Sequence, residues 1–140
     1  MPKPPPPPEL DRFLRAPNPA VIATLRADGR PHTAATWYLW DDGRVLVNMD
    51  ESRRRLEHLR GDPRVSLTVL GGGEEWYRHV TLEGRAARLQ PDSDLAGIDR
   101  LARHYTGEPF QNRDRPRVSA WIEVEAWHAW AGAGAWTGAG

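Results

Sequence analysis

The sequence contains no cysteine, which excludes a disulfide scaffold and thiolate chemistry and suits a reducing compartment. It also lacks an apolar run of the ~18 residues that a bilayer-spanning helix needs, and it has no signal-peptide core. The net charge is also zero, because 19 basic and 19 acidic residues cancel. The overall charge therefore does not indicate binding to nucleic acid or to a membrane. We therefore expect a cytoplasmic protein in which any basic site is local.

The 140 residues are enough for one domain with a real core. The first eight residues are mostly proline and cannot donate backbone hydrogen bonds, so they predict a disordered leader; a proline-rich recruiting segment is the alternative. Residues 9–131 form the predicted domain, and the glycine- and alanine-rich residues 132–140 predict a flexible tail. Seven tryptophans favour an interface or a flat ligand as well as a core.

Apolar, β-branched runs separated by short turns dominate the domain. Two Asp-Gly turns join the first three runs, which predicts an antiparallel meander, and Gly84 predicts a bulge in the fifth run. Turns this short exclude parallel crossovers. The pattern indicates a mainly β, small antiparallel barrel of the α+β class. The predicted strands are 20–26, 30–40, 44–48, 63–70, 76–90 and 117–127, and the predicted helices are 9–16, 51–60 and 92–105.

Three adjacent arginines open the predicted helix 51–60, where the positive end of the helix dipole disfavours cations. Asp50 or Ser52 is the predicted cap of this helix. On a helical wheel at ~100° per residue, Arg53 and Arg55 flank the apolar face and Arg54 points to solvent. Two arginines beside free backbone N–H groups outline a phosphate site. The alternative is that they are solvated or paired with neighbouring carboxylates.

Other candidate groups carry weaker signals. The five histidines show no metal-ligand spacing, and no Ser-His-Asp arrangement, P-loop or paired-carboxylate motif is present. The alternating run 37–40 predicts one face for the core or a dimer interface and another that could stack on a flat ring. Arg113, Arg115 and Arg117 lie among prolines, where a solvated loop is the simpler interpretation than binding of an acidic ligand.

The run AVIATLRADGRPHTAATWYLWDDG, followed by DPRVSLTVL and then VTLEGRA, resembles the pyridoxamine 5'-phosphate oxidase-like split β-barrel superfamily. Within it, the chain is most similar to the actinobacterial branch that uses the deazaflavin coenzyme F420. The resemblance implies a six-stranded antiparallel split β-barrel with two or three short helices. It also implies an F420-dependent oxidoreductase that passes hydride from reduced F420 to a small molecule. Such proteins are homodimers with the cofactor between protomers.

The resemblance also implies which residues bind the cofactor. Arg53 and Arg55 correspond to the basic residues that receive its phosphate, beside Ser52 at the start of the same helix. The ring would lie along the second predicted strand, and a tryptophan of the last strand could complete the groove between protomers. The remaining implied cofactor-binding residues are Thr36, Trp37, Tyr38, Asn48, Met49 and Trp130.

One of two departures from the family pattern bears on the choice of cofactor. FMN-using relatives resemble each other in an arginine and a lysine that hold the FMN phosphate and ribityl chain, and these positions look like Ala34 and Leu39 here. This loss of charge favours F420 over FMN, although an FMN-dependent oxidoreductase stays the first alternative. A non-catalytic protein that binds F420, FMN or haem is the second. His79 replaces an aromatic residue of relatives, with no role that the sequence identifies.

Overall fold

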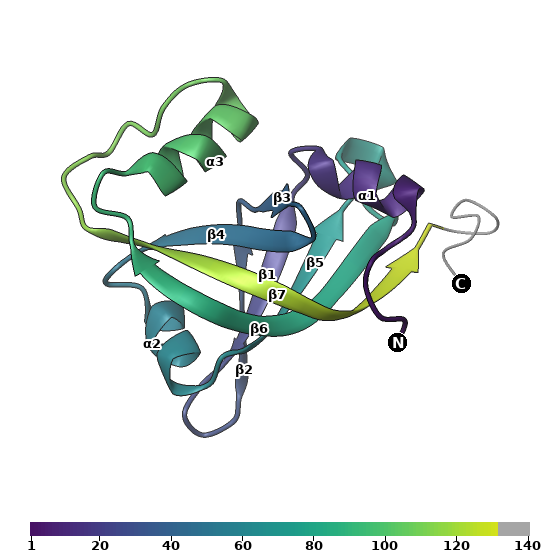
Figure 1. The fold of residues 1–140 in the computed structure, drawn as a ribbon, viewed down its shortest axis with the longest axis horizontal. Helices are drawn as coiled ribbons and strands as arrows, with labels where there is room; N and C mark the ends of the chain where they lie inside the picture. Colours follow the sequence, from purple (N-terminus) through teal and green to yellow (C-terminus); the bar gives the residue numbers. More distant parts are fainter. Residues whose placement is uncertain (132–140) are drawn as a thin grey trace.

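The computed structural model describes residues 1–131; the predicted tail, 132–140, lies outside the described residues. Its strands form one antiparallel sheet in the order β2-β1-β5-β6-β7-β4-β3, which curls without closing (Figure 1). The strands are β1 (Ala20–Leu25), β2 (Pro31–Thr36), β3 (Leu39–Asp41), β4 (Arg44–Asp50), β5 (Arg64–Leu70), β6 (His79–Pro91) and β7 (Arg117–Trp130). The helices are α1 (Pro8–Arg15), α2 (Arg54–Gly61), η1 (Gly73–Glu75) and α3 (Ala96–Thr106).

The two long strands β6 and β7 pair along most of their length, and both bend strongly. The predicted bulge at Gly84 is confirmed by a register shift between Glu83 and Gly84. A Cβ at Gly84 would lie 1.9 Å from the carbonyl oxygen of Glu123, so only glycine allows β7 to approach this closely. The bulge therefore helps the sheet curl around its core.

The predicted long strand 30–40 and the three-stranded meander are wrong. The chain leaves β2 at Trp37 and Tyr38 and begins β3 at the opposite edge of the sheet, so β4 pairs with β3 and β7 rather than with β2. Tyr38 fixes this crossing, because its side chain is fully buried and its hydroxyl lies 2.7 Å from the carbonyl oxygen of Leu14. The break adds a seventh strand to the six predicted.

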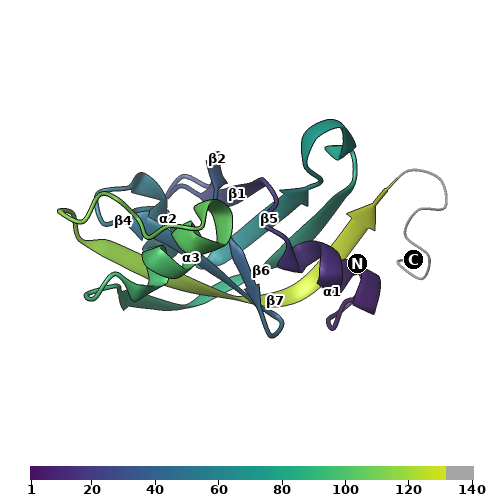
Figure 2. The same ribbon diagram turned by 90° about the horizontal axis from the view of Figure 1, so that it is seen from above.

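The core lies inside the curl of the sheet. Leu10 and Leu14 of α1 and Leu56 and Leu59 of α2 are buried against it, as their helical spacing requires. The third helix, α3, lies over β4 and β7 (Figure 2) and packs there on a separate apolar cluster that includes Leu46. A cavity beside α3 is lined by its residues Ile98, Leu101 and Tyr105.

The N-terminal residues contact β7 in the structure. The backbone N–H of Trp127 donates to the carbonyl oxygen of Pro2 (2.9 Å), and its indole N–H donates to that of Lys3 (3.2 Å). These contacts occupy β7 beyond the point where its pairing with β4 ends at Glu123. No helix within residues 1–131 has the length and apolarity that crossing a membrane requires.

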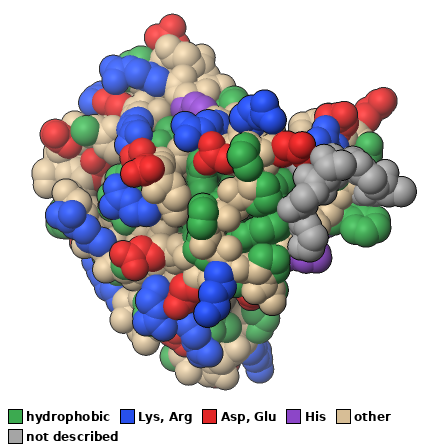
Figure 3. All heavy atoms as spheres, turned by 45° about the vertical axis from the view of Figure 1, so that its right-hand side comes forward, with side chains coloured by type: hydrophobic (Ala, Val, Ile, Leu, Met, Phe, Trp, Pro, Cys, Tyr) green, Lys and Arg blue, Asp and Glu red, His purple; other side chains and the backbone are tan. Residues whose placement is uncertain are grey.

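Large aromatic side chains are exposed near the ends of β6 and β7. Trp76 and Tyr77 precede β6, and Trp130 ends β7; they are 66%, 45% and 53% exposed. The space-filling view of this side shows apolar side chains gathered between charged ones (Figure 3). Exposed aromatic groups of this size are typical of an interaction surface.

Candidate functional site

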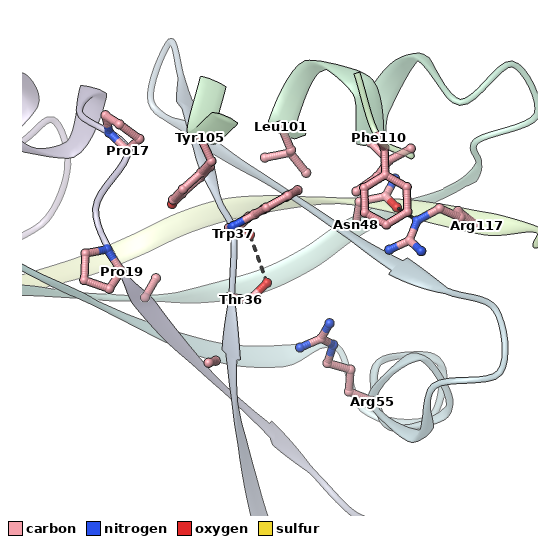
Figure 4. Close-up of a pocket in the computed structure, with 13 residues that line it drawn as sticks. Pro17, Pro19, Thr36, Trp37, Asn48, Arg55, Leu101, Tyr105, Phe110 and Arg117 are labelled. Atoms are coloured by element: carbon pink, nitrogen blue, oxygen red, sulfur yellow. Dashed lines mark hydrogen bonds between the residues drawn. The ribbon is translucent and has the colours of Figure 1, made fainter. Parts of the chain in front are cut away.

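An apolar cavity of about 590 Å³ lies between α3, the loop after α1 and the end of β2 (Figure 4). Aromatic rings form its upper wall: Trp37 stacks on Tyr105 with ring centroids 5.3 Å apart and planes 13° apart, and it meets Phe110 edge-on. The cavity is lined by Pro17, Pro19, Ala20, Ala35, Thr36, Trp37, Asn48, Arg55, Ile98, Leu101, Tyr105, Phe110 and Arg117. A flat, largely apolar ligand matches these walls.

The aromatic wall is held by hydrogen bonds to the loops around it. The hydroxyl of Tyr105 donates to the carbonyl oxygen of Asn18 (2.6 Å) and accepts from the backbone N–H of Tyr38 (3.3 Å). Burial raises the pKa of Tyr105 to about 12, so the phenol stays protonated at neutral pH. The carboxylate of Asp99 binds the backbone N–H of Phe110 (3.0 Å) and thereby fixes the third ring.

A second, basic cavity of about 800 Å³ adjoins the first at the N-terminus of α2. The two cavities share Ala35, Arg55, Phe110 and Arg117. Five arginines and one aspartate line the basic cavity. This excess of positive charge beside the free N–H groups of a helix start suits an anion such as phosphate. The basic cavity is lined by His32, Ala34, Ala35, Asp50, Ser52, Arg53, Arg54, Arg55, Phe110, Asn112, Arg115 and Arg117.

Arg55 differs from the other arginines of this cavity in the surroundings of its Nε atom. Its Nε is buried and finds no hydrogen-bond partner within residues 1–131. Burial, and then the neighbouring charges of Arg53 and Arg117, lowers the pKa of Arg55, so its charged form is destabilised. The guanidinium extends from α2 toward the space between Thr36 and Arg117 (Figure 4). A bound anion would offset the cost of placing this cation there.

The predicted capping of α2 is wrong. The helix begins at Arg54 with Arg53 as its N-cap, and no side chain caps it. Asp50 instead accepts from the backbone N–H of Ser52 (2.8 Å) and pairs with Arg115, which together hold the pKa of its carboxyl well below the usual range. The first N–H groups of α2 are therefore free of side-chain caps, and they belong to residues that line the basic cavity.

Arg117 lies at the junction of the two cavities. Its Nε donates to Oδ1 of Asn48 (2.7 Å), and its guanidinium lies over the ring of Phe110 at 4.7 Å from the centroid. Burial lowers the pKa of Arg117, as it does that of Arg55. Asn48 itself is buried and is held by further bonds from its amide.

The structure brings six of the nine sequence-predicted cofactor residues to the two cavities: Thr36, Trp37, Asn48, Ser52, Arg53 and Arg55. Three lie elsewhere. The side chains of Tyr38 and Met49 point into the core, because alternation along an extended chain turns them away from their neighbours in the cavity. Trp130 lies at the far end of β7, in register with His79, and lines neither cavity.

The sequence pattern does not identify several of the residues that line the cavities. Tyr105 was part of an amphipathic helix, and Phe110 lay in a polar stretch without periodicity, so neither carried a signal for a ligand. The sequence favours a solvated loop for Arg113, Arg115 and Arg117 and leaves binding of an acidic ligand as the alternative. In the structure Arg113 pairs with Asp99 (2.8 Å), and Arg115 and Arg117 line the basic cavity. Arg54 is exposed as predicted, but it also borders the basic cavity.

No group of three or more His, Asp or Glu side chains within the described part of the chain could hold a metal ion. The polar groups that line the two cavities are five arginines, two asparagines (Asn48 and Asn112), Asp50, His32 and the hydroxyl groups of Thr36, Ser52 and Tyr105. A set of this kind can bind and orient an anion beside a flat ring, and it contains no paired carboxylates for hydrolysis.

An antiparallel sheet that curls but stays open, with a ligand cavity at its edge, defines the class of split β-barrels. The chain belongs to the pyridoxamine 5'-phosphate oxidase family, whose model matches residues 6–131. The predicted fold class and the resemblance on which it depended are thereby confirmed.

Solved structures share this fold. A protein described as an F420 reductase is 24% identical, with a TM-score of 0.76 over 84% of this chain and 94% of that chain. A conserved hypothetical protein of Mycobacterium tuberculosis is 26% identical, with a TM-score of 0.70 over 88% and 82% of the two chains. General Stress Protein 26 of Bacillus anthracis is 18% identical, with a TM-score of 0.65 over 86% and 93%. The last two descriptions name no ligand.

Proposed function

We propose that this protein is an F420-dependent oxidoreductase, in which reduced F420 donates a hydride to a small-molecule acceptor. The observation that carries the proposal is the partly buried Arg55, which lies beside Arg53 and Arg117 where a basic and an apolar cavity meet. Its buried Nε has no hydrogen-bond partner within residues 1–131. A cofactor with a flat ring at one end and a phosphate at the other would occupy both cavities at once.

The residues present fit such a cofactor. The rings of Trp37 and Phe110 and the side chain of Leu101 offer an apolar wall for the tricyclic ring. The arginines and the free N–H groups of α2 would hold the phosphate. The sequence comparison with FMN-using relatives expects an arginine and a lysine at the positions of Ala34 in β2 and Leu39 in β3. Ala34 lines the basic cavity and Leu39 packs against the apolar cluster beneath α3, so neither supplies the charge expected of an FMN site.

When bound, the deazaflavin supplies two electrons as a hydride, and the chain supplies binding and surroundings. Pro17, Pro19 and Leu101 line the apolar cavity, and a ring bound against them would displace water from their surfaces. Arg55 and Arg117 would fix the phosphate and thus the position of the ring. The hydroxyl of Tyr105 donates its proton to the carbonyl oxygen of Asn18 and stays protonated at neutral pH. We therefore assign it to holding the aromatic ring in place rather than to proton transfer.

The test is a titration of purified protein with F420, followed by the fluorescence of the ring. We expect binding at micromolar concentrations, and we expect the double substitution Arg53→Ala and Arg55→Ala to weaken it by at least about a hundredfold. Arg60→Ala is the matched control, because Arg60 is exposed on the same helix and lines neither cavity. Equal binding by the double variant and the control would refute the anion site.

We also propose that the protein is a homodimer. The support is the set of exposed aromatic side chains Trp76, Tyr77 and Trp130, which a second copy could cover. In a dimer of this kind, Trp130 of one protomer could approach the cavities of its partner, although it lines neither cavity of its own protomer.

A further inference from the structure

A buried polar network joins the apolar and basic cavities, and Asn48 lies at its centre. Asn48, Asp92 and Ser119 are only 5%, 7% and 7% exposed. The Nδ2 group of Asn48 donates to Oδ2 of Asp92 (3.0 Å) and to Oγ of Ser119 (2.9 Å), while its Oδ1 accepts from Nε of Arg117 (2.7 Å). Both amide donors and the amide acceptor are thus engaged.

Chemistry fixes the direction of this amide. An ionised carboxylate only accepts hydrogen bonds, so the NH₂ group of Asn48 must face Asp92. A guanidinium only donates, so the carbonyl oxygen must face Arg117. A reversed amide would set an acceptor against a carboxylate and donors against a cation, both in a buried position. Asn48 therefore has one stable orientation, and that orientation presents an acceptor to Arg117.

Asp92 connects the same network to α3. Its two carboxylate oxygens accept from the backbone N–H groups of Gly97 and Ile98, each at 2.9 Å, in the first turn of the helix. This helix carries Ile98, Leu101 and Tyr105, which line the apolar cavity. A continuous series of hydrogen bonds therefore leads from α3, through Asp92 and Asn48, to Arg117, which lines both cavities.

We propose that Asn48 is a positioning residue, which orients Arg117 toward an anion in the basic cavity and couples that orientation to the placement of α3. With Nε held by Asn48 and its face over Phe110, Arg117 keeps both terminal nitrogens for a ligand; neither forms a hydrogen bond within residues 1–131. The identity of the anion as the cofactor's phosphate rests on the proposed function, whereas the orientation is a property of the unliganded protein.

The test follows the Nε–H resonance of Arg117 by NMR in ¹⁵N-labelled protein, assigned by its loss in Arg117→Lys. Asn48→Leu keeps the size of the side chain but removes the acceptor. We expect the resonance to shift or vanish by exchange with water, and the affinity for inorganic phosphate, measured by titration, to fall about tenfold. Asn48→Ser retains a hydroxyl for Asp92 but no acceptor for Arg117, and it repeats the test if Asn48→Leu fails to fold.

Ser119→Ala is the matched control, because it removes a bond of the same amide on the side away from Arg117. It should leave the resonance in place and phosphate affinity within about twofold. An unchanged resonance in Asn48→Leu, or equal losses of phosphate affinity in Asn48→Leu and Ser119→Ala, would overturn the positioning role. Failure of the wild-type protein to bind F420 would instead end the proposed function, and the Arg117 resonance would still decide the role of Asn48.

Discussion

At the scale of single residues, the site depends on how three adjacent arginines differ in environment. A helical wheel drawn from the sequence separated Arg55 from Arg54, and in the structure Arg55 is partly buried while Arg54 is exposed. The wheel could not find Arg117, because its proximity to Arg55 arises from the pairing of β4 with β7, distant in the sequence. Periodicity in the sequence identifies one face of a helix, but the residues that this face contacts depend on the tertiary fold.

We predict that Arg55→Met stabilises the ligand-free protein and weakens anion binding. Removing a buried donor without a partner should raise the free energy of unfolding by about 1 kcal/mol. Denaturation in urea measures this change, and a phosphate titration measures the loss of binding. Arg60→Met, on the exposed side of the same helix, should change neither property appreciably. A lower free energy of unfolding for Arg55→Met would show that Arg55 is satisfied in the unliganded protein.

At the scale of elements, the loop between α3 and β7 is fixed by Asp99. Arg113 pairs with both oxygens of this carboxylate at 2.8 and 3.1 Å and, with the N–H of Phe110, lowers its pKa. The sequence predicted the helix and its apolar face from spacing. It did not predict the ion pair between Arg113 and Asp99, because a carboxylate and an arginine fourteen residues apart form no periodic pattern.

The Asp99 carboxylate should make part of the stability depend on pH. Its folded pKa lies below the unfolded value of about 3.9, so its contribution is complete above that pH and is lost as the pH falls through the folded pKa. Asp99→Asn should therefore lower the free energy of unfolding at pH 7, and the difference from wild type should shrink below about pH 4. Asp114→Asn, in the exposed part of the same loop, is the control. A difference independent of pH would contradict this role.

The first turn of α3 tolerates no side chain at Gly97. A Cβ there would lie 2.3 Å from Oγ of Ser119 and 3.2 Å from both carboxylate oxygens of Asp92. Gly97→Ala should therefore displace α3 and lower the free energy of unfolding by about 1–3 kcal/mol, measured by denaturation. Gly61→Ala, where a Cβ meets nothing within 4 Å, should leave stability unchanged or higher. Equal stabilities of the two variants would show that the network around Asp92 accommodates the added methyl.

At the scale of the whole molecule, composition and turns predicted an antiparallel barrel, and the resemblance predicted the split form. The crossing of the chain at Trp37 and Tyr38 from one sheet edge to the other was missed, because the run 30–40 reads as one strand. The break follows from tertiary contacts: Tyr38 is buried against α1, and its N–H meets Tyr105. That same break turns Trp37 into the cavity.

The proposed dimer makes a prediction at this scale. Sedimentation equilibrium should give a mass of twice 15.8 kDa, and Trp130→Ser should weaken association by about 2 kcal/mol if the exposed aromatic groups form the contact. The substitution Arg60→Ser, at an exposed residue of α2 outside this aromatic set, is the comparison. A monomer at all concentrations would remove the dimer while leaving the site within one chain intact.

We propose that the joined cavities prefer F420 to FMN. The dissociation constants of F420 and FMN for the same preparation of wild-type protein, measured by equilibrium fluorescence, decide this preference. With Ala34 and Leu39 in place of charged residues, we predict a micromolar constant for F420 and binding of FMN at least about tenfold weaker. Tighter binding of FMN than of F420 would refute the proposed preference for F420.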